Sequence, residues 1–243
     1  MKTRTGVLWA GVLVLGLAAP AQAALHGLIY DDVLDIFWLQ DANLAASNTF
    51  GVGGIDAAGR MSWDTAQSWI AAMNADGGTG YLGYTDWRLP LIVDTGAAGC
   101  DNAYAGTDCG YNVQTGSAAT TVYSEMASLS YDTLGNLALY DTSGSEPQPG
   151  WGLTNTGPFV NLQSYSYWSG TEYVPNTEYG PNPDSAWGFG FGFGGQGASD
   201  KYNGFYAWAV RPGDVAVPEP ASLALVGTTL GGLLGVGWRR RRR

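Results

Sequence analysis

The sequence predicts an α+β fold with one main helix, short twisted antiparallel strands and long loops. Three observations predict it. Apolar residues recur at helical spacing between Ser62 and Gly77. Aromatic residues alternate with glycine from Trp187 to Gly194, which is the period of a β-strand. Long stretches rich in glycine, proline, asparagine and aspartate separate these segments and indicate loops.

The N-terminal end of the 243-residue chain has the pattern of a secretory signal peptide. Lys2 and Arg4 precede an apolar run at residues 7–17, and an Ala-x-Ala cleavage site ends at Ala23. A membrane anchor is the weaker alternative, because the apolar run is short. We therefore expect residues 1–23 to be removed and the remainder to be exported.

The C-terminal end, residues 217–243, predicts a short transmembrane helix. A Val-Pro-Glu-Pro sequence precedes the uncharged residues 221–238, and arginines occupy 239–243. Eighteen residues at a rise of about 1.5 Å each span roughly 27 Å, which is enough for the bilayer core. The arginines are expected to hold that end in the cytoplasm.

Residues 24–216 remain as one predicted globular domain. This segment has four basic and twenty acidic residues, a net charge of −16. Such a field repels nucleic acid and anionic lipid, and it disfavours sulfated polysaccharide. Neutral and cationic partners remain open, and no nucleic-acid partner is expected.

The first half of this domain predicts a hairpin and then the main helix. Two apolar runs, residues 28–30 and 33–39, favour a β-hairpin. Ser62 is a typical N-cap, and Asp64 suits the positive end of the helix dipole. Gly77 and the glycine after it are expected to end the helix.

Residues 80–90, GYLGYTDWRLP, follow the helix and are predicted to be extended up to the proline. Alternation along an extended segment directs Trp87 and Leu89 toward the core. Arg88 lies on the opposite side and is expected to bind a carboxylate or loop carbonyls. The residues predicted to be structural are Asp86, Trp87, Arg88, Leu89, Pro90 and Arg211.

The second half predicts loops, one short helix and strands. Residues 94–121 and 142–151 read as long loops, and a short helix is expected to begin near Ser124. Strands are predicted at residues 165–173, 187–193 and 205–211. The glycine face of the second of these strands suggests that another backbone approaches it closely.

Four blocks of sequence carry a resemblance to a known family. They are YDDVLDIFWLQDAN, MSWDTAQSWIAAMN with GYTDWRLP, YWSGTEY, and AWGFGFG leading to YAWAVRPGD. In that order they resemble the Lcl C-terminal domain family of exported bacterial modules. The resemblance implies a C-type-lectin-like fold related to formylglycine-generating-enzyme domains. It also implies glycan or glycosaminoglycan binding in some members and no established catalytic residues.

The C-terminal tail resembles the PEP-CTERM sorting signal. By that likeness, an exosortase in the inner membrane of a Gram-negative, polysaccharide-secreting bacterium reads the motif Pro218, Glu219 and Pro220. The membrane-anchored precursor would then lose its helix, and the domain would reach the cell surface or the extracellular space. A permanent tail anchor is the alternative.

Cys100 and Cys109 are the only cysteines, and in an exported chain they predict a disulfide. A metal site or a reactive thiol pair, as in the copper-dependent oxidase relatives, is the alternative. No third cysteine, nearby histidine or basic neighbour supports it.

Catalysis has little support in the sequence, and no enzyme is expected. His26 is the single histidine, which disfavours hydrolase triads and histidine-rich metal centres. Paired carboxylates can hydrolyse glycosides, but twenty acids do not identify a pair. No cofactor is expected, with calcium as the alternative, because two loops that lack an EF-hand pattern carry oxygen donors. These donors are Asp94, Asp101, Asn102 and Asp108, and Asn176, Glu178, Asn182 and Asp184.

Aromatic residues in loops are the candidates for carbohydrate binding, because flat rings stack on sugar faces. Packing within the loops is the equal alternative. The leading hypothesis is a non-catalytic lectin-like module for neutral or cationic extracellular polysaccharide. A structural biofilm or matrix protein without a specific ligand and an enzyme of the formylglycine-generating type are the alternatives. The candidate residues are Tyr104, Tyr111, Trp151, Tyr165, Tyr173 and Tyr179.

Overall fold

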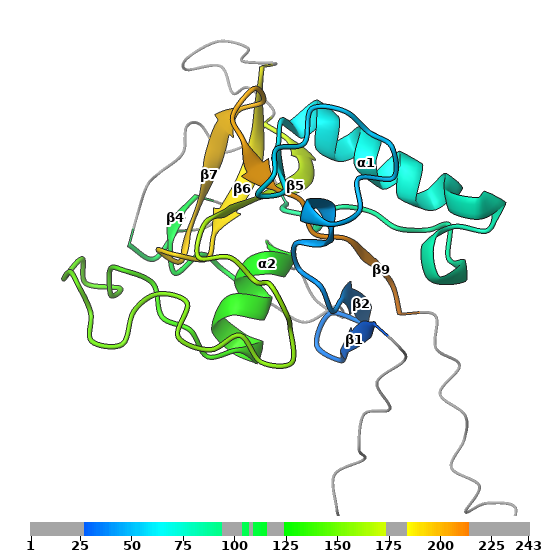
Figure 1. Ribbon diagram of the computed structural model, residues 1–243. Helices are drawn as coiled ribbons and strands as arrows, with labels where there is room; N and C mark the ends of the chain where they lie inside the picture. The colour runs from blue at the N-terminus through cyan, green and yellow to red at the C-terminus, as the bar shows by residue number, and fades with distance from the viewer. Residues whose placement is uncertain (1–26, 94–103, 107–108, 116–123, 174–183, 214–243) are drawn as a thin grey trace, which may run out of the picture.

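Two β-sheets organise the part of the chain that the computed structural model describes, residues 27–93, 104–106, 109–115, 124–173 and 184–213. One sheet has the strand order β1-β2-β9, and the other has the order β3-β8-β5-β6-β7-β4. In Figure 1, β5, β6 and β7 lie side by side, with α1 to their right and α2 below them. The expected mixture of two helices with sheets, in which strands and loops dominate, is confirmed.

The predicted opening hairpin is present as β1 (Leu28–Asp31) and β2 (Ile36–Leu39), which pair antiparallel. The second strand begins at Ile36, three residues later than predicted, because the Asp31 carboxylate organises the turn. It accepts hydrogen bonds from the backbone N–H groups of Val33 and Leu34, both at 3.1 Å, and from the Trp38 indole at 3.1 Å. Burial raises the pKa of Asp31, although these hydrogen bonds oppose the shift.

The main helix forms as predicted and is α1 (Trp63–Ala75). Ser62 caps it by accepting a hydrogen bond from the Thr65 backbone N–H. After the helix, Gly77 adopts a positive φ of 56°, which suits glycine and ends the helical path. The buried face of α1 consists of Trp63, Ala66, Trp69, Ile70 and Met73.

The segment at residues 80–90 is only partly extended. The turn η3 (Tyr81–Gly83) occupies its start, so the prediction of a wholly extended segment is wrong. Gly80 permits this turn, because its φ is +78° and a Cβ there would lie 1.8 Å from the Tyr84 carbonyl oxygen. Beyond the turn, Trp87 and Leu89 are buried as predicted.

Arg88 binds a carboxylate, as predicted. Its two terminal nitrogens donate to the two oxygens of Glu125 at 2.7 Å each, which is the bidentate geometry of a strong charged pair. Glu125 begins the short helix α2 (Glu125–Ser128), which Ser124 caps and the π-helical turn η4 (Leu129–Thr133) continues. The predicted second helix is therefore present, and Arg88 fixes it to the preceding segment.

Asp86 accepts two hydrogen bonds of 2.9 Å from Arg211 on β9 (Val210–Pro212). The Arg211 guanidinium also lies 4.0 Å from the centre of the Tyr84 ring. Because β9 pairs with β2, this ion pair connects the middle of the chain to the opening hairpin.

The larger sheet differs from the prediction at two points. The strand predicted at residues 187–193 ends at Gly190 and turns back into a partner that alternation did not predict, because that partner is mostly glycine and polar residues. The strand predicted at 205–211 is two strands in different sheets, so this segment joins the two sheets. The strands of the larger sheet are β3 (Arg60–Met61), β4 (Gly110–Tyr111), β5 (Ser166–Glu172), β6 (Ser185–Gly190), β7 (Gly195–Asp200) and β8 (Phe205–Tyr206).

The Asp86–Arg211 pair predicts an unequal response to the loss of either partner. The Arg211 side chain is 9% exposed and that of Asp86 is 38% exposed. Asp86→Ala should therefore lower the free energy of unfolding by about 3–5 kcal/mol, because it leaves a buried cation without its carboxylate partner. Arg211→Met should destabilise by only about 1–2 kcal/mol, because water can reach the remaining carboxylate. Urea unfolding of both variants measures the difference.

The double variant Asp86→Ala, Arg211→Met is the control for the cost of leaving a buried cation unpaired. It should be nearly as stable as Arg211→Met alone, because no buried cation remains in it. Equal losses for the two single variants, or a larger loss for Arg211→Met, would show that the buried guanidinium does not set the stability of this junction.

Candidate functional site

A cavity of about 310 Å³ lies on one face of the six-stranded sheet. Its floor is formed by Gly188 and Gly190 of β6 together with Gly195 and Gly197 of β7. Gly188 pairs with Gly197, and Gly190 pairs with Gly195, so the four positions form a continuous bare strip, called here the glycine floor. Alternation sends the intervening aromatic side chains of β6 into the core on the opposite face.

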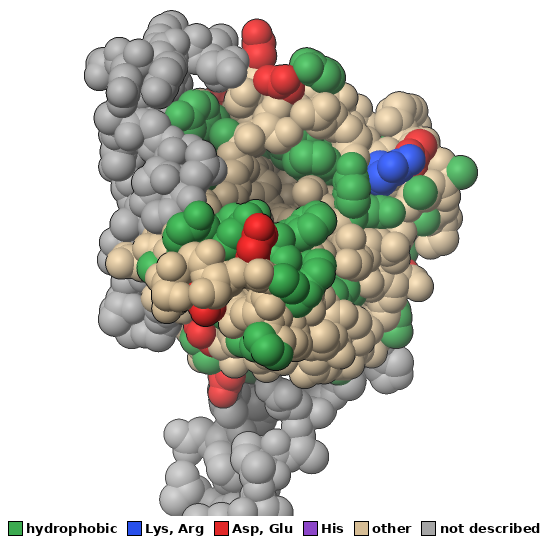
Figure 2. Space-filling view, turned by 90° about the vertical axis from the view of Figure 1, so that its left-hand side faces the viewer, with side chains coloured by type: hydrophobic (Ala, Val, Ile, Leu, Met, Phe, Trp, Pro, Cys, Tyr) green, Lys and Arg blue, Asp and Glu red, His purple; other side chains and the backbone are tan. Residues whose placement is uncertain are grey.

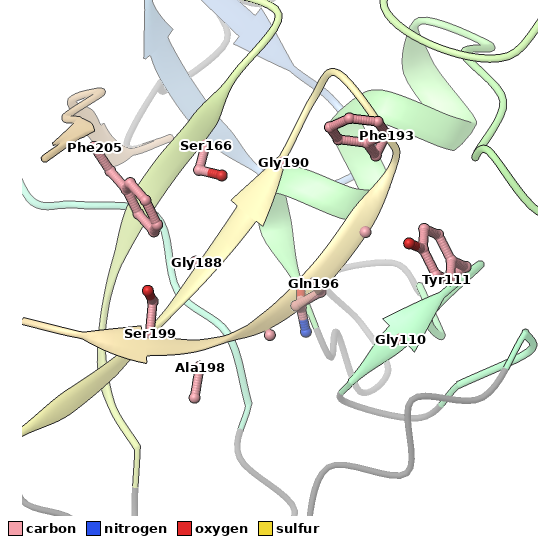
Figure 3. A pocket seen from close by; sticks show the side chains of 12 residues that line it. Gly110, Tyr111, Ser166, Gly188, Gly190, Phe193, Gln196, Ala198, Ser199 and Phe205 are labelled. Carbon is pink, nitrogen blue, oxygen red and sulfur yellow. The ribbon is translucent and has the colours of Figure 1, made fainter. Parts of the chain in front are cut away.

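Aromatic rings form the two sides of this cavity, which we call the groove. Figure 3 shows Phe205 on one side and Tyr111 and Phe193 on the other, with the Tyr111 hydroxyl directed toward the glycine floor. Phe205 is held in place by buried Trp168, whose ring centre lies 4.4 Å away. The groove is therefore shaped like a slot between flat rings.

Hydroxyl groups supply the polar contacts that the groove offers. Ser166 and Ser199 lie beside the glycine floor (Figure 3). Ser199 Oγ accepts a hydrogen bond from Asn203 Nδ2 at 2.8 Å, so its own proton can donate to a ligand. Among the residues that the structure describes, those lining the groove include no aspartate, glutamate, lysine, arginine or histidine. Figure 2 shows this side of the molecule, where hydrophobic side chains surround a hollow.

Packing explains only some of the glycines in the floor. A Cβ at Gly188 would lie 2.9 Å from the Tyr167 carbonyl oxygen, so the predicted close approach of another backbone is confirmed there. Within the described part of the chain, a Cβ at Gly190 would meet nothing closer than 3.6 Å, and one at Gly197 nothing closer than 3.9 Å. Neither residue has the positive φ that favours glycine. At these two positions the absent side chain keeps the groove open without being required by the fold.

Neighbouring rings support the Tyr111 side of the groove. The Tyr111 ring centre is 4.7 Å from that of Tyr140, which in turn stacks on Tyr104 at 5.0 Å. Asn112 joins the same segments, because its Nδ2 donates to the carbonyl oxygens of Tyr104 and Tyr140 at 2.7 and 3.0 Å. A hydrogen bond to Glu146 raises the pKa of Tyr140 to about 12, so this ring remains neutral at ordinary pH.

The structure brings three of the six predicted carbohydrate-binding residues to the groove. Tyr111 lines it, Tyr165 packs edge-on against Phe205 at 6.1 Å, and Trp151 stacks on Phe193 at 5.9 Å. Tyr104 lies behind Tyr140. The other two candidates are not brought to the groove: Tyr173 packs against buried Trp187, and Tyr179 lies outside the described residues.

Sequence reasoning missed Phe193 and Phe205 as groove residues. Both belong to aromatic patterns that predicted regular strands, and such patterns usually indicate core. The signal that could have identified them is the run of glycines at 188, 190, 192 and 194, because a bare strand face leaves adjacent rings uncovered.

The cysteine and calcium predictions fall mainly outside the described residues. Cys109 is fully buried and is not a free cysteine. Its predicted partner Cys100 is not among the described residues, so the disulfide stays a prediction. Of the eight oxygen donors considered for calcium, only Asp184 is described, and the described ranges contain no cluster of three or more His, Cys, Asp or Glu residues suited to a metal ion.

Comparison with known proteins identifies the C-terminal tail. No curated protein and no solved structure shows significant similarity to the chain. Within the ranges that the structure describes, no helix is long and apolar enough to cross a membrane, and the segment predicted to do so lies outside them. Residues 216–242 match the PEP-CTERM protein-sorting motif, which includes Pro218, Glu219 and Pro220. The chain is therefore the membrane-anchored precursor of an exported surface protein that an exosortase sorts.

Proposed function

We propose that the exported domain is a non-catalytic, lectin-like module whose groove binds a neutral extracellular polysaccharide. The observation that carries this proposal is the bare glycine floor between two aromatic sides. A pyranose ring has flat C–H faces that stack on aromatic rings and an equatorial rim of hydroxyls that exchange hydrogen bonds with side-chain hydroxyls. Phe205, Tyr111 and the two serines supply both kinds of contact.

The charges of the domain favour a neutral ligand over an anionic one. The four basic residues among residues 24–216 each form an ion pair, namely Arg60 with Asp56, Arg88 with Glu125, Lys201 with Glu172 and Arg211 with Asp86. No cation is thus left over to bind carboxylate or sulfate groups of an acidic polymer. A cationic polysaccharide is less favoured than a neutral one, since the described residues that line the groove include no carboxylate.

The proposal extends the resemblance to the Lcl C-terminal domain family to the fold and the domain limits. It assigns residues 1–23 to a signal peptide, 24–216 to a C-type-lectin-like domain and 217–243 to the sorting signal. The organism is then a Gram-negative bacterium, and a Cys100–Cys109 disulfide staples the loop that precedes Tyr111. Calcium is not required, because the proposed contacts are aromatic and hydroxyl groups.

The groove favours a ligand-binding module over the two alternative functions. A matrix protein that only hydrates its surroundings does not need glycine at positions 190 and 197, because the fold does not require glycine there. An enzyme of the formylglycine-generating type needs reachable thiols, whereas Cys109 is fully buried.

Removal of the tail is the first prediction of the proposed function. Mass spectrometry of the mature protein from an exosortase-containing host should find a chain without residues 221–243, because the sorting motif directs cleavage near Pro218–Pro220. A variant with alanine at Pro218, Glu219 and Pro220 should retain the tail in the membrane fraction. Intact tail on the mature unmodified protein would refute the processing step.

The glycine floor provides the second prediction. Gly190→Ala and Gly197→Ala should leave the free energy of unfolding unchanged or raise it by about 0.4–1 kcal/mol, because each Cβ has room and alanine restricts the unfolded chain. Both should weaken retention on a neutral polysaccharide at least about tenfold, because a methyl group raises the floor where the sugar must approach. Affinity electrophoresis through gels containing glucans, mannans or xylans measures retention.

Gly170→Ala is the matched control for this experiment. Gly170 is a β5 glycine with room for a Cβ, the nearest atom being 3.5 Å away, and it does not line the groove. It should keep both stability and retention. Failure of the unmodified protein to be retained by any neutral polysaccharide, or equal loss of retention in all three variants, would contradict the proposed function.

A further inference from the structure

We infer that the groove is one end of a longer binding path and that the ligand is a chain of several sugar units. The inference rests on the proposed function and deepens it. The second contact point is the pair formed by Trp151 and Phe193, called here the aromatic platform. Phe193 lines the groove and also stacks on Trp151, so the platform adjoins the groove.

The platform has the geometry of a surface for sugar stacking. The two rings lie in nearly parallel planes, 15° apart, with centres separated by 5.9 Å. Phe193 is 56% exposed and Trp151 is 37% exposed. Large aromatic side chains that remain so exposed next to one another form an apolar patch, and such patches on a soluble domain mark interaction surfaces.

Backbone contacts hold the platform rigid before any ligand binds. The Leu139 N–H donates to the Phe193 carbonyl oxygen at 2.8 Å, and the Gly152 N–H donates to the Leu137 carbonyl oxygen at 2.9 Å. The Tyr131 hydroxyl donates to the Gly194 carbonyl oxygen at 2.6 Å. Three separate segments are thus fixed around the two rings, and binding does not have to order them.

The size of the groove favours a chain over a single sugar. A volume of about 310 Å³ lies at the lower end of the range for small-molecule sites, so the groove alone accepts a short ligand. A single unit bound over the glycine floor contacts Phe193 but gains no contact with Trp151. A second or third unit of the same chain reaches Trp151 and adds a stacking contact with the exposed part of that ring.

The lining of this path specifies the chemical class of the chain. From Phe205 across the floor to Trp151, the path presents aromatic rings, glycine backbone and hydroxyls. An unbranched chain of neutral pyranoses offers alternating flat faces and hydroxyl edges along its length. Branches at every unit would conflict with the slot between the rings, and anionic substituents would conflict with the acidic domain around it.

Chain-length dependence of binding tests the inference. The probes are ladders of one to six units of cello-, manno-, xylo- and laminari-oligosaccharides, titrated calorimetrically against the mature protein. Affinity should rise in steps up to about three or four units and then level off. Trp151→Ala should weaken binding of the longest probe about tenfold and leave the shortest binding probe unchanged. Trp151→Phe should restore most of the loss, since it keeps a flat ring.

Gly190→Ala separates this inference from the proposed function, because it should weaken short and long probes alike. Binding that is as tight for the shortest probe as for the longest would overturn the inference and leave the groove function standing. So would a Trp151→Ala variant, folded by circular dichroism, that binds every probe normally. Absence of binding to any probe by the unmodified protein would overturn both.

Discussion

The fold depends on how an acidic domain uses four cations. Two of them act on the same short segment: Arg88 extends from it to Glu125 of α2, and Asp86, two residues earlier, receives Arg211 from β9. Trp87 and Leu89 are buried in the core, whereas Asp86 and Arg88, which alternate with them, bind two different partners. A segment of three residues thus joins the helical side of the molecule to its final strand. Each of these two guanidinium groups forms two hydrogen bonds with a single carboxylate, and this bidentate geometry fixes its partner.

This junction also positions the groove. From Arg211 the chain runs back through Trp208, whose indole N–H donates to the Leu39 carbonyl oxygen at 2.7 Å. Trp208 packs against Trp38 and Tyr167, with ring centres 4.7 and 5.8 Å apart. Three residues before Trp208, Phe205 of β8 forms one side of the groove. The ion pair at residue 211 therefore stabilises the connection between the sheets that holds this ring over the glycine floor.

Much of the fold follows from local patterns, and the site does not. Ser62, the spacing of apolar residues and Gly77 sufficed for α1, because a helix depends on neighbours three and four positions apart. The hairpin and the burial of Trp87 and Leu89 followed from alternation alone. In contrast, β7 has no apolar alternation to reveal it, and it pairs only because β6 presents its edge. Phe193 and Phe205 are close to Tyr111 only after the sheet has formed. Contacts of that kind cannot be predicted from the spacing of residues along the sequence.

The energetic balance at the glycine floor is the strongest reason to assign it a function. Glycine in a strand destabilises by roughly 0.5–1 kcal/mol relative to alanine. Gly190 and Gly197, which the fold does not require, therefore lower the free energy of unfolding by about 1–2 kcal/mol together. The total stability of such a domain is expected to be only about 5–15 kcal/mol. The exposed Phe193 next to them adds apolar surface left in water. Both features become favourable once a ligand covers the rings and approaches the bare backbone. An inert structural protein would gain stability by losing them, whereas a polysaccharide-binding groove requires both.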